Sequence, residues 1–329
     1  MSQSRLNLLL CLLVLALFLA SMLIGPARLG PLDSLRALVA GGDEATMIIM
    51  REIRLPRAIL ALAVGFGLGL CGAVLQGFLR NPLAEPGIIG VSAAASFGAV
   101  LVFYSGLAGA AFYALPAGAL AGAALSVVIL LAIAARHGST LTLILSGVAL
   151  TSLAGALTSL VLNLSPNPFA SYEIIFWLLG SVKDRSMNDV WIALPLMLAG
   201  WALLVFSGRA LDAFSLGEEA AAGLGVDMRR TRLLVIAGVA LSVGAGTAVT
   251  GAIGFVGLVV PHLVRPLTDR MPGSLLLPSG LGGAALLLAA DIAVRIIVPG
   301  KELNVGVVTA LIGAPFFLWL IVRSRREIF

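Results

Sequence analysis

Long apolar runs separated by short polar segments fill most of this 329-residue chain. A helix needs about 20 residues to cross the hydrocarbon core of a bilayer, and an unpaired backbone group in lipid costs several kcal/mol. Because the runs are long and continuous, they predict an all-α membrane protein rather than a barrel of short alternating strands. We expect about ten transmembrane helices, near residues 6–24, 57–79, 88–105, 112–135, 141–163, 190–207, 233–249, 252–267, 275–298 and 304–322.

Two segments of this pattern are harder to assign. Glycines interrupt residues 233–267, which predicts a turn near Gly251, with one long helix as the alternative. Residues 169–182 are apolar but too short to cross a bilayer, so a re-entrant or interfacial helix is expected there. Gly65 and Gly69 form a small-xxx-small face that lets helix backbones approach closely. No repeat or linker divides the chain, which we treat as one transmembrane domain, residues 1–329.

Composition points to the same surroundings. Hydrophobic residues make up 60% of the chain and charged residues 11%, with a mean hydropathy of +1.09, whereas soluble domains carry about 25% charged residues. The chain is therefore expected to contact membrane lipid and no nucleic acid. Residues 6–24 are interpreted as an uncleaved first span, because no small-residue cleavage site is clear before Gly25 and leucines, not small residues, precede Cys11.

Positive charges in the loops predict the orientation, because cytoplasmic loops carry an excess of Lys and Arg. With both termini in the cytoplasm, twelve of the 21 such residues lie inside and nine outside, which modestly favours this orientation. The inside residues are Arg5, Arg80, Arg136, Arg209, Arg229, Arg230, Arg232, Arg265, Arg270, Arg323, Arg325 and Arg326. The outside residues are Arg28, Arg36, Arg51, Arg54, Arg57, Lys183, Arg185, Arg295 and Lys301.

The outer charges need a physical reason, since positive charge is disfavoured on that face. One reason is an acidic partner that is steered by a positive external surface. Such a surface would consist of Arg51, Arg54, Arg57 and Arg295. The other reason is that these arginines snorkel and anchor helix ends at lipid headgroups. Charge alone leaves both interpretations open.

The largest loop expected in the cytoplasm is residues 209–232. Ser215 and Glu218 fit a capping box for a helix that starts near Leu216, and the glycines that follow would end it. A short helix, a glycine break and a basic tail then form either a protruding knob for a partner or a plain connector between two spans.

Motifs for energy coupling are absent from the sequence. No G-x-x-x-x-G-K-[ST] occurs, and Lys183 and Lys301 lie in other settings, so the chain does not bind ATP through a P-loop. Inside the spans Asp291 is the clear acid, and it stands four residues before Arg295, which favours a self-neutralised pair over a proton relay.

Ligand and catalytic groups are equally sparse. His137 and His262 have no companion ligand at metal spacing, so no metal site is expected, and no Ser-His-Asp or paired-carboxylate set suggests an enzyme. The chain itself is expected to hold no cofactor.

Several motifs, in order along most of the chain, resemble the FecCD-type permeases of type II ABC importers, the family for iron siderophores, haem and vitamin B12. They are RLPR at 54–57, NPLAEPGIIGVS at 81–92, LSGVAL at 145–150, SLGEEAAAGLG at 215–225, GAIGFVGLVVPHLVR at 251–265 and ADIAVRIIVPGKELNVGVVTALIGAPFFLWLI at 290–321. The resemblance implies a type II ABC importer permease fold and a homodimer with the pathway on its twofold axis. It also implies two ATPase subunits that use ATP and Mg²⁺, a periplasmic or extracellular substrate-binding protein, and a location in a bacterial cytoplasmic (inner) membrane.

The resemblance further assigns roles to single residues. Arg54, Arg57 and Arg295 match external arginines that receive glutamates of the binding protein. The residues that match the cytoplasmic gate are Asn81, Leu83, Thr140 and Leu141. The position of Leu141 is polar in cobalamin permeases, so a more apolar gate that excludes water by dewetting is expected here. The residues that match the ATPase coupling helix, within the coupling loop 209–232, are Leu216, Gly217, Glu218, Glu219, Ala220, Ala221, Gly223 and Gly225.

These features predict a transport subunit for a bulky metal chelate, such as a ferric siderophore, haem or cobalamin. Alternating access would be driven by a separate ATPase, and most of the selectivity would belong to the binding protein. The alternative is a secondary transporter driven by an ion gradient, or a channel, working without an ATPase. Co-purification of an ATP-hydrolysing subunit would decide between them.

Overall fold

The computed structural model describes residues 2–27, 29–109, 111–136, 140–165, 168–297 and 303–324. Helices joined by short turns make up these ranges, with no strand among them. Several charged residues considered above lie outside the described residues, namely Arg28, His137, Lys301, Arg325 and Arg326.

The helices agree with the predicted spans. Seven helices of the described ranges are long and apolar enough to cross a membrane, and α5, α13 and α15 are shorter apolar helices. Their bounds are α1 (Gln3–Leu23), α4 (Leu55–Phe78), α5 (Val91–Tyr104), α6 (Ala114–Arg136), α7 (Thr140–Asn163), α9 (Met187–Phe206), α12 (Met228–Thr250), α13 (Val256–Val264), α14 (Pro272–Ile297) and α15 (Val305–Ser324). Together they coincide with the ten expected spans.

Short helices occupy the connections between these spans. They are α2 (Pro31–Val39), α3 (Glu44–Ile48), the π-helix η1 (Ile49–Arg54), η2 (Pro86–Ile89), η3 (Leu107–Gly109), α8 (Pro168–Leu178), α10 (Gly208–Phe214), α11 (Glu218–Gly223) and η4 (Arg265–Leu267). Of these, α8 forms where a short helix that does not cross the bilayer was expected.

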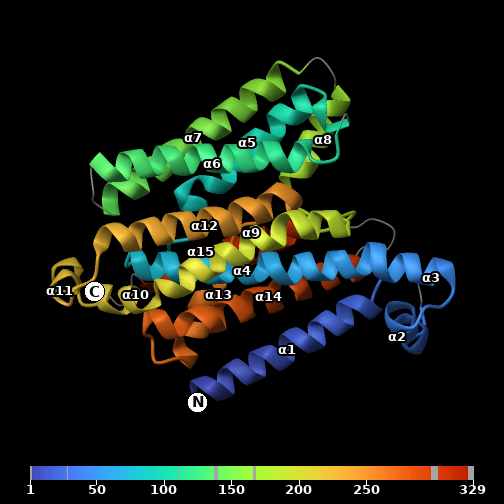
Figure 1. Cartoon of the computed structure of the whole chain (residues 1–329), viewed down its shortest axis with the longest axis horizontal. Helices are drawn as coiled ribbons and strands as arrows, with labels where there is room; N and C mark the ends of the chain where they lie inside the picture. Colours follow the sequence, from blue (N-terminus) through green and yellow to red (C-terminus); the bar gives the residue numbers. More distant parts are fainter. Residues whose placement is uncertain are drawn as a thin grey trace.

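The two ends of the bundle carry different elements. The start of α1, α10 and α11 lie at one end, and α2 and α3 lie at the other (Figure 1). We call them the α11 end and the α2 end. On one side of the bundle α5, α6, α7 and α8 form a group, and α1 lies on the opposite side (Figure 1). Between them α4, α9, α12 and α14 form the centre.

Glycines bring the central helices into backbone contact. Of the helix pairs in the described ranges, α4 and α14 pack most extensively. A Cβ atom at Gly65 would overlap the carbonyl oxygen of Gly283, and one at Gly69 would overlap that of Ser279. The close-approach face predicted from Gly65 and Gly69 is therefore confirmed, and these two helices pack as one body.

Residues 233–267 form two helices, so the alternative of one long helix is wrong. α12 ends at Thr250, and Gly251 has a φ of +72°, which a glycine adopts without strain. Gly251 also lies so close to the carbonyl of Trp177 that a Cβ atom would overlap it. The chain runs on without helix until Phe255, whose φ of +67° starts α13.

Candidate functional site

Three arginines assigned to the external face come together at the α2 end, but they lie below the surface. Arg54 is 4% exposed and Arg57 is 7% exposed. Arg57 donates to the carboxylate of Asp291 from Nε at 2.9 Å and from Nη2 at 2.8 Å. Arg295 forms an ion pair with the same carboxylate, which is fully buried. Asp291 thus pairs with arginines of two helices, Arg57 of α4 and Arg295 of α14, and not only with the arginine of its own helix.

The same arginines hold the end of α1. Arg295 donates to the carbonyl oxygens of Ser21 at 2.8 Å and Ile24 at 2.9 Å. Arg54 donates to the carbonyl oxygen of Met22 at 2.7 Å. The last carbonyls of a helix have no partner within the helix and form the negative end of its dipole, so guanidinium groups stabilise them.

An exposed positive surface formed by all four arginines is therefore wrong. A buried guanidinium needs acceptors, and Arg54, Arg57 and Arg295 have them within this chain. Arg51 alone of the four is exposed, and it donates to the carbonyl oxygen of Ala37 at 2.9 Å. Headgroup snorkelling does not describe the buried three either. Contact of these arginines with a binding protein stays a prediction.

The turn after α4 carries two of the residues expected at the gate. The side-chain oxygen of Asn81 accepts a hydrogen bond from the backbone N–H of Leu83 at 2.9 Å, which makes the turn rigid. Gly90, with a φ of +79°, then lies against the carbonyl of Gly147 in α7. The turn packs on α7 around Gly147 rather than at Leu141, which is 65% exposed at the start of that helix.

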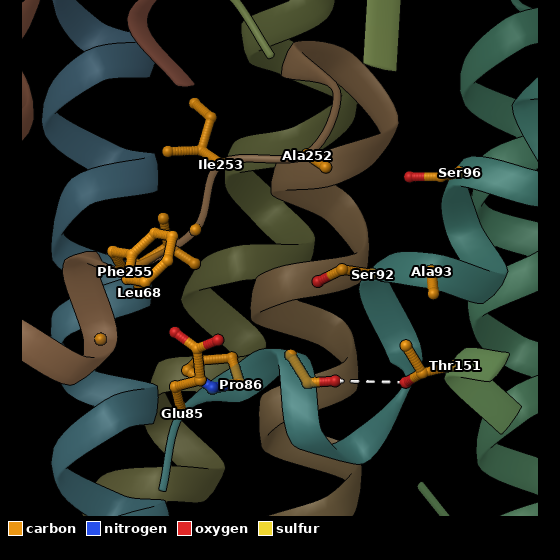
Figure 2. A pocket seen from close by; sticks show the side chains of 13 residues that line it. Leu68, Glu85, Pro86, Ser92, Ala93, Ser96, Thr151, Ala252, Ile253 and Phe255 are labelled. Carbon is orange, nitrogen blue, oxygen red and sulfur yellow. Dashed lines mark hydrogen bonds between the residues drawn. The ribbon is translucent and has the colours of Figure 1, made fainter. Parts of the chain in front are cut away.

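Behind this turn lies a cavity of about 240 Å³ (Figure 2), whose lining is mainly apolar. We call it the polar cavity after the four polar side chains that line it, Glu85, Ser92, Ser96 and Thr151. Leu68, in the middle of α4, lines it together with the turn, α5, α7 and the break between α12 and α13. Figure 2 shows the carboxylate of Glu85 facing Phe255 and the hydroxyl of Ser96 pointing into the open space. Thr151 donates to the carbonyl oxygen of Gly147 at 2.9 Å.

Ser96 is the unusual group of this cavity. It is 6% exposed, and its hydroxyl has no hydrogen-bond partner among the described residues. Polar groups in a space of this size are normally satisfied by water, so the cavity can hold water or a polar part of a ligand in the middle of the bundle. Sequence reasoning missed it, although Ser92 and Ser96 are spaced to share one face of a helix.

The unpartnered hydroxyl carries a stability prediction. We expect Ser96→Ala to leave the melting temperature of the purified protein unchanged or to raise it, because the variant removes a buried hydroxyl that makes no bond to another described residue. Ser242→Ala is the matched control. Ser242 accepts a hydrogen bond from the ring nitrogen of Trp201 at 3.0 Å, so its loss should cost about 1–3 kcal/mol. Thermal unfolding in detergent measures both, and an equal loss in the two variants would contradict the assignment.

The loop expected to couple to a partner differs from its predicted form. Ser215 does not cap a helix at Leu216, because its hydroxyl donates to the carbonyl oxygen of Asp212 at 2.6 Å and closes α10. α11 starts at Glu218 after Gly217, whose φ of +106° is incompatible with the expected capping box. The predicted glycine stop is confirmed, since α11 ends at Gly223.

The structure brings the expected coupling segment to the expected gate helix. The hydroxyl of Thr140, the first residue of α7, donates to Oε1 of Glu218, the first residue of α11, at 2.9 Å. Around them Leu141, Leu216 and Leu224 are each about two-thirds exposed. The α11 end therefore presents apolar side chains to its surroundings, beside a direct contact with α7.

Metal binding finds no support in the described part of the chain, which contains no group of three His, Cys, Asp or Glu residues placed to hold an ion. The ring of His262 packs edge-on against Phe316 at 5.6 Å.

A multi-pass helix bundle with a central cavity, and with a short helix flanked by exposed leucines at one end, has the architecture of a membrane transport protein. A family model described as the FecCD transport family matches residues 12–323. The chain belongs to this family, whose members are permease subunits of ABC importers.

Curated relatives carry different cargoes. The chain is 43% identical over 291 residues to the cobalamin import system permease protein BtuC of Halobacterium salinarum, covering 87% of this chain and 76% of the relative. It is 37% identical over 322 residues to the hemin transport system permease protein HmuU of Yersinia pestis, covering 96% and 95%. A solved inward-facing structure of a metal-chelate type ABC transporter superposes with a TM-score of 0.87 at 33% identity, covering 97% of this chain and 99% of that one.

Proposed function

We propose that this chain is the permease subunit of an ATP-driven importer that forms a homodimeric pathway for a bulky metal chelate. Ferric siderophores, haem and cobalamin are the cargo class that its relatives suggest. A substrate-binding protein would deliver the cargo at the α2 end. Two ATPase subunits would bind at the α11 end, which would then be the cytoplasmic end of a protein in the inner membrane.

The hydrogen bond between Thr140 and Glu218 carries this proposal. α11 lies at the end of the bundle with exposed Leu216 and Leu224, which suits a cleft in a separate subunit. Because Glu218 contacts the first residue of α7, movement of α11 displaces the helix that also carries Leu141. A plain connector between two spans would require neither the exposed leucines nor this contact.

The exposed side of α7 supports a second copy of the chain as a partner. Of the 24 residues of α7 only Leu143, Gly147 and Ala154 are buried, whereas 19 of the 24 residues of α4 are buried. Lipid or another subunit must therefore cover α7. Because α7 also lines the polar cavity through Thr151, a copy facing it across a twofold axis would enclose a pathway between the two α7 helices.

The buried cluster of Arg54, Arg57, Asp291 and Arg295 at the α2 end, which we call the arginine clamp, changes where a binding protein could make contact. Arg57 and Arg295 hold α4, α14 and α1 in place, so they support the surface on which a binding protein would dock. Of the arginines expected outside, Arg36 and Arg51 are exposed and available for direct contact. Charge reversal at Arg51 should weaken docking of the binding protein without weakening ATPase assembly. An unchanged affinity at physiological salt would remove Arg51 from the docking surface.

Co-expression with the cognate ATPase tests the proposal. We expect the ATPase to co-purify with the chain and ATP-driven uptake into proteoliposomes to fall about tenfold or more in Glu218→Lys, because the change breaks the contact with Thr140. Glu44→Lys is the matched control, since Glu44 is also an exposed first residue of a short helix but lies at the α2 end. Uptake by the chain alone, driven by a proton or sodium gradient, would instead support a secondary transporter.

A further inference from the structure

The side chain of Asp212 joins α10 to the start of α14. Its Oδ1 accepts a hydrogen bond from the backbone N–H of Gly273 at 2.6 Å, across 61 positions of sequence. The carboxylate lies directly against Gly273, since a Cβ atom there would come within 2.6 Å of Oδ2. Two residues further along α10, the ring of Phe214 packs on Phe78 at the end of α4, with ring centres 5.8 Å apart. α10 thus contacts the start of α14 and the end of α4.

Asp212 is not the only acid that binds the start of α14. Asp269 lies just before the helix and accepts hydrogen bonds from the backbone N–H of Met271 at 3.1 Å and from the hydroxyl of Ser274. The Ser274 hydroxyl also holds the pKa of the Asp269 carboxyl below its usual range. A local cap of this kind already stabilises the positive end of the helix dipole. The bond from Asp212 satisfies the backbone N–H of Gly273 in the first turn of α14, and it also connects that helix to α10.

α14 belongs to a body that spans the whole bundle. With 26 residues it is about 39 Å long, enough to cross a bilayer. Its glycine contacts with α4 leave no side chains between the two backbones, and the side chain of Gln3 at the start of α1 donates to the carbonyl oxygen of Ser274 at 2.8 Å. We call α1, α4 and α14 the α14 unit.

At the α2 end the α14 unit is closed by the buried arginine clamp. Asp291 of α14 binds Arg57 of α4, and Arg295 of α14 binds the carbonyl oxygens at the end of α1. A body held at both ends, with α4 and α14 in backbone contact near the middle, transmits a displacement because packed helices shift as units rather than deform continuously.

We propose that Asp212 is a positioning residue that carries movements of α10 and α11 through the α14 unit to the α2 end. It is a second route out of the coupling loop, separate from the contact between α11 and α7. The inference rests on the proposed function, because the movement at the α11 end would come from an ATPase. As a consequence, a change of nucleotide state in the ATPase would shift the α2 end, where a binding protein would dock.

The test measures a distance at the α2 end of the permease assembled with its ATPase. Val39 of α2 and Leu107 of η3, both exposed, would each be replaced by an unnatural amino acid with a keto group, to which a spin label is attached. The distance between them is compared in nucleotide-free and ATP-vanadate states. We expect a nucleotide-dependent change in the wild type, its loss in Asp212→Ala, and its retention in Asp212→Asn, whose amide oxygen still accepts from Gly273. The control Asp269→Ala should lower the melting temperature but keep the change.

A cross-linked variant keeps the test decisive if Asp212→Ala folds poorly. In a background with Cys11→Ser and Cys71→Ala, Asp212→Cys combined with Gly273→Cys places two thiols at this contact. The oxidised protein should show the nucleotide-dependent change and the reduced protein should lose it.

The results distinguish failure of the proposed role of Asp212 from failure of the proposed function. A full change in Asp212→Ala, or in the reduced cross-link variant, would overturn the role of Asp212. Loss of the change in Asp269→Ala as well would reduce that role to helix capping and overturn it too. If the wild type neither hydrolyses ATP with its partner nor shows a change, the proposed function fails and this inference falls with it.

Discussion

Asp291→Ala is expected to cost about 3–5 kcal/mol of folding stability, the largest effect foreseen for a single polar side chain here. The carboxylate is fully buried and neutralises Arg57 and Arg295 together. Its removal takes this carboxylate from two buried guanidinium groups, and the ion pair between α4 and α14 at the α2 end is lost. Thermal or denaturant unfolding of the purified protein in detergent measures the cost, because the cluster needs no partner to form.

Two companion variants show whether burial is the cause. Asp291→Asn keeps an oxygen acceptor but no charge, so its stability should fall between those of the wild type and Asp291→Ala. Asp33→Ala removes an exposed acid from the first turn of α2 and should change stability by about 0.5 kcal/mol or less. An Asp291→Ala variant as stable as Asp33→Ala would mean that water or a partner, rather than Asp291, balances the two arginines.

The arginine clamp shows where prediction from sequence stops. The order of charges identified Arg54, Arg57, Asp291 and Arg295 as residues of one end, and the spacing of Asp291 and Arg295 predicted their pairing. It could not show burial, because whether a guanidinium faces water depends on the carbonyls that α1 brings to it. Those carbonyls carry no sequence signal, since every residue has one.

The helices themselves were largely predictable, because span length and apolar content are properties of the sequence alone. The break at Gly251 was also readable from the glycine pattern. The capping box was not, because a Ser and a Glu at the right spacing form one only if the residues between them are helical, and Gly217 adopts a φ of +106°. Local motifs fail where a single backbone angle decides the outcome.

The central cavity depends on how the turn after α4 folds back. Apolar periodicity describes α4 and α5 as two spans, but it does not show that Glu85 and Leu68 line one cavity or that Gly90 packs against Gly147. A polar lining then arises from elements far apart in sequence. The two-helix break and the returning turn together place non-helical backbone inside the bundle, which is tolerated where it lines a cavity.

Gly72→Ala tests the backbone contact that holds the centre of the bundle together. A Cβ atom at Gly72 of α4 would overlap the carbonyl oxygen of Gly257 in α13, and neither backbone can move aside like the end of a side chain. We expect the variant to lose about 3 kcal/mol of stability, at the upper end of overpacking costs, because α4 and α13 must separate. Transport should fall with it, since α13 begins at the edge of the polar cavity.

Gly155→Ala is the matched control within another span. No atom outside the local helix lies within 4 Å of a Cβ atom at Gly155, so the substitution should gain the helix propensity of alanine, up to about 1 kcal/mol. The two variants add the same methyl group to a transmembrane helix, so opposite signs isolate the contact as the cause. Equal melting temperatures would show that α13 moves away from α4 without cost, and would contradict a rigid centre. Loss of stability in Gly155→Ala alone would instead indicate that a second copy packs on that face of α7.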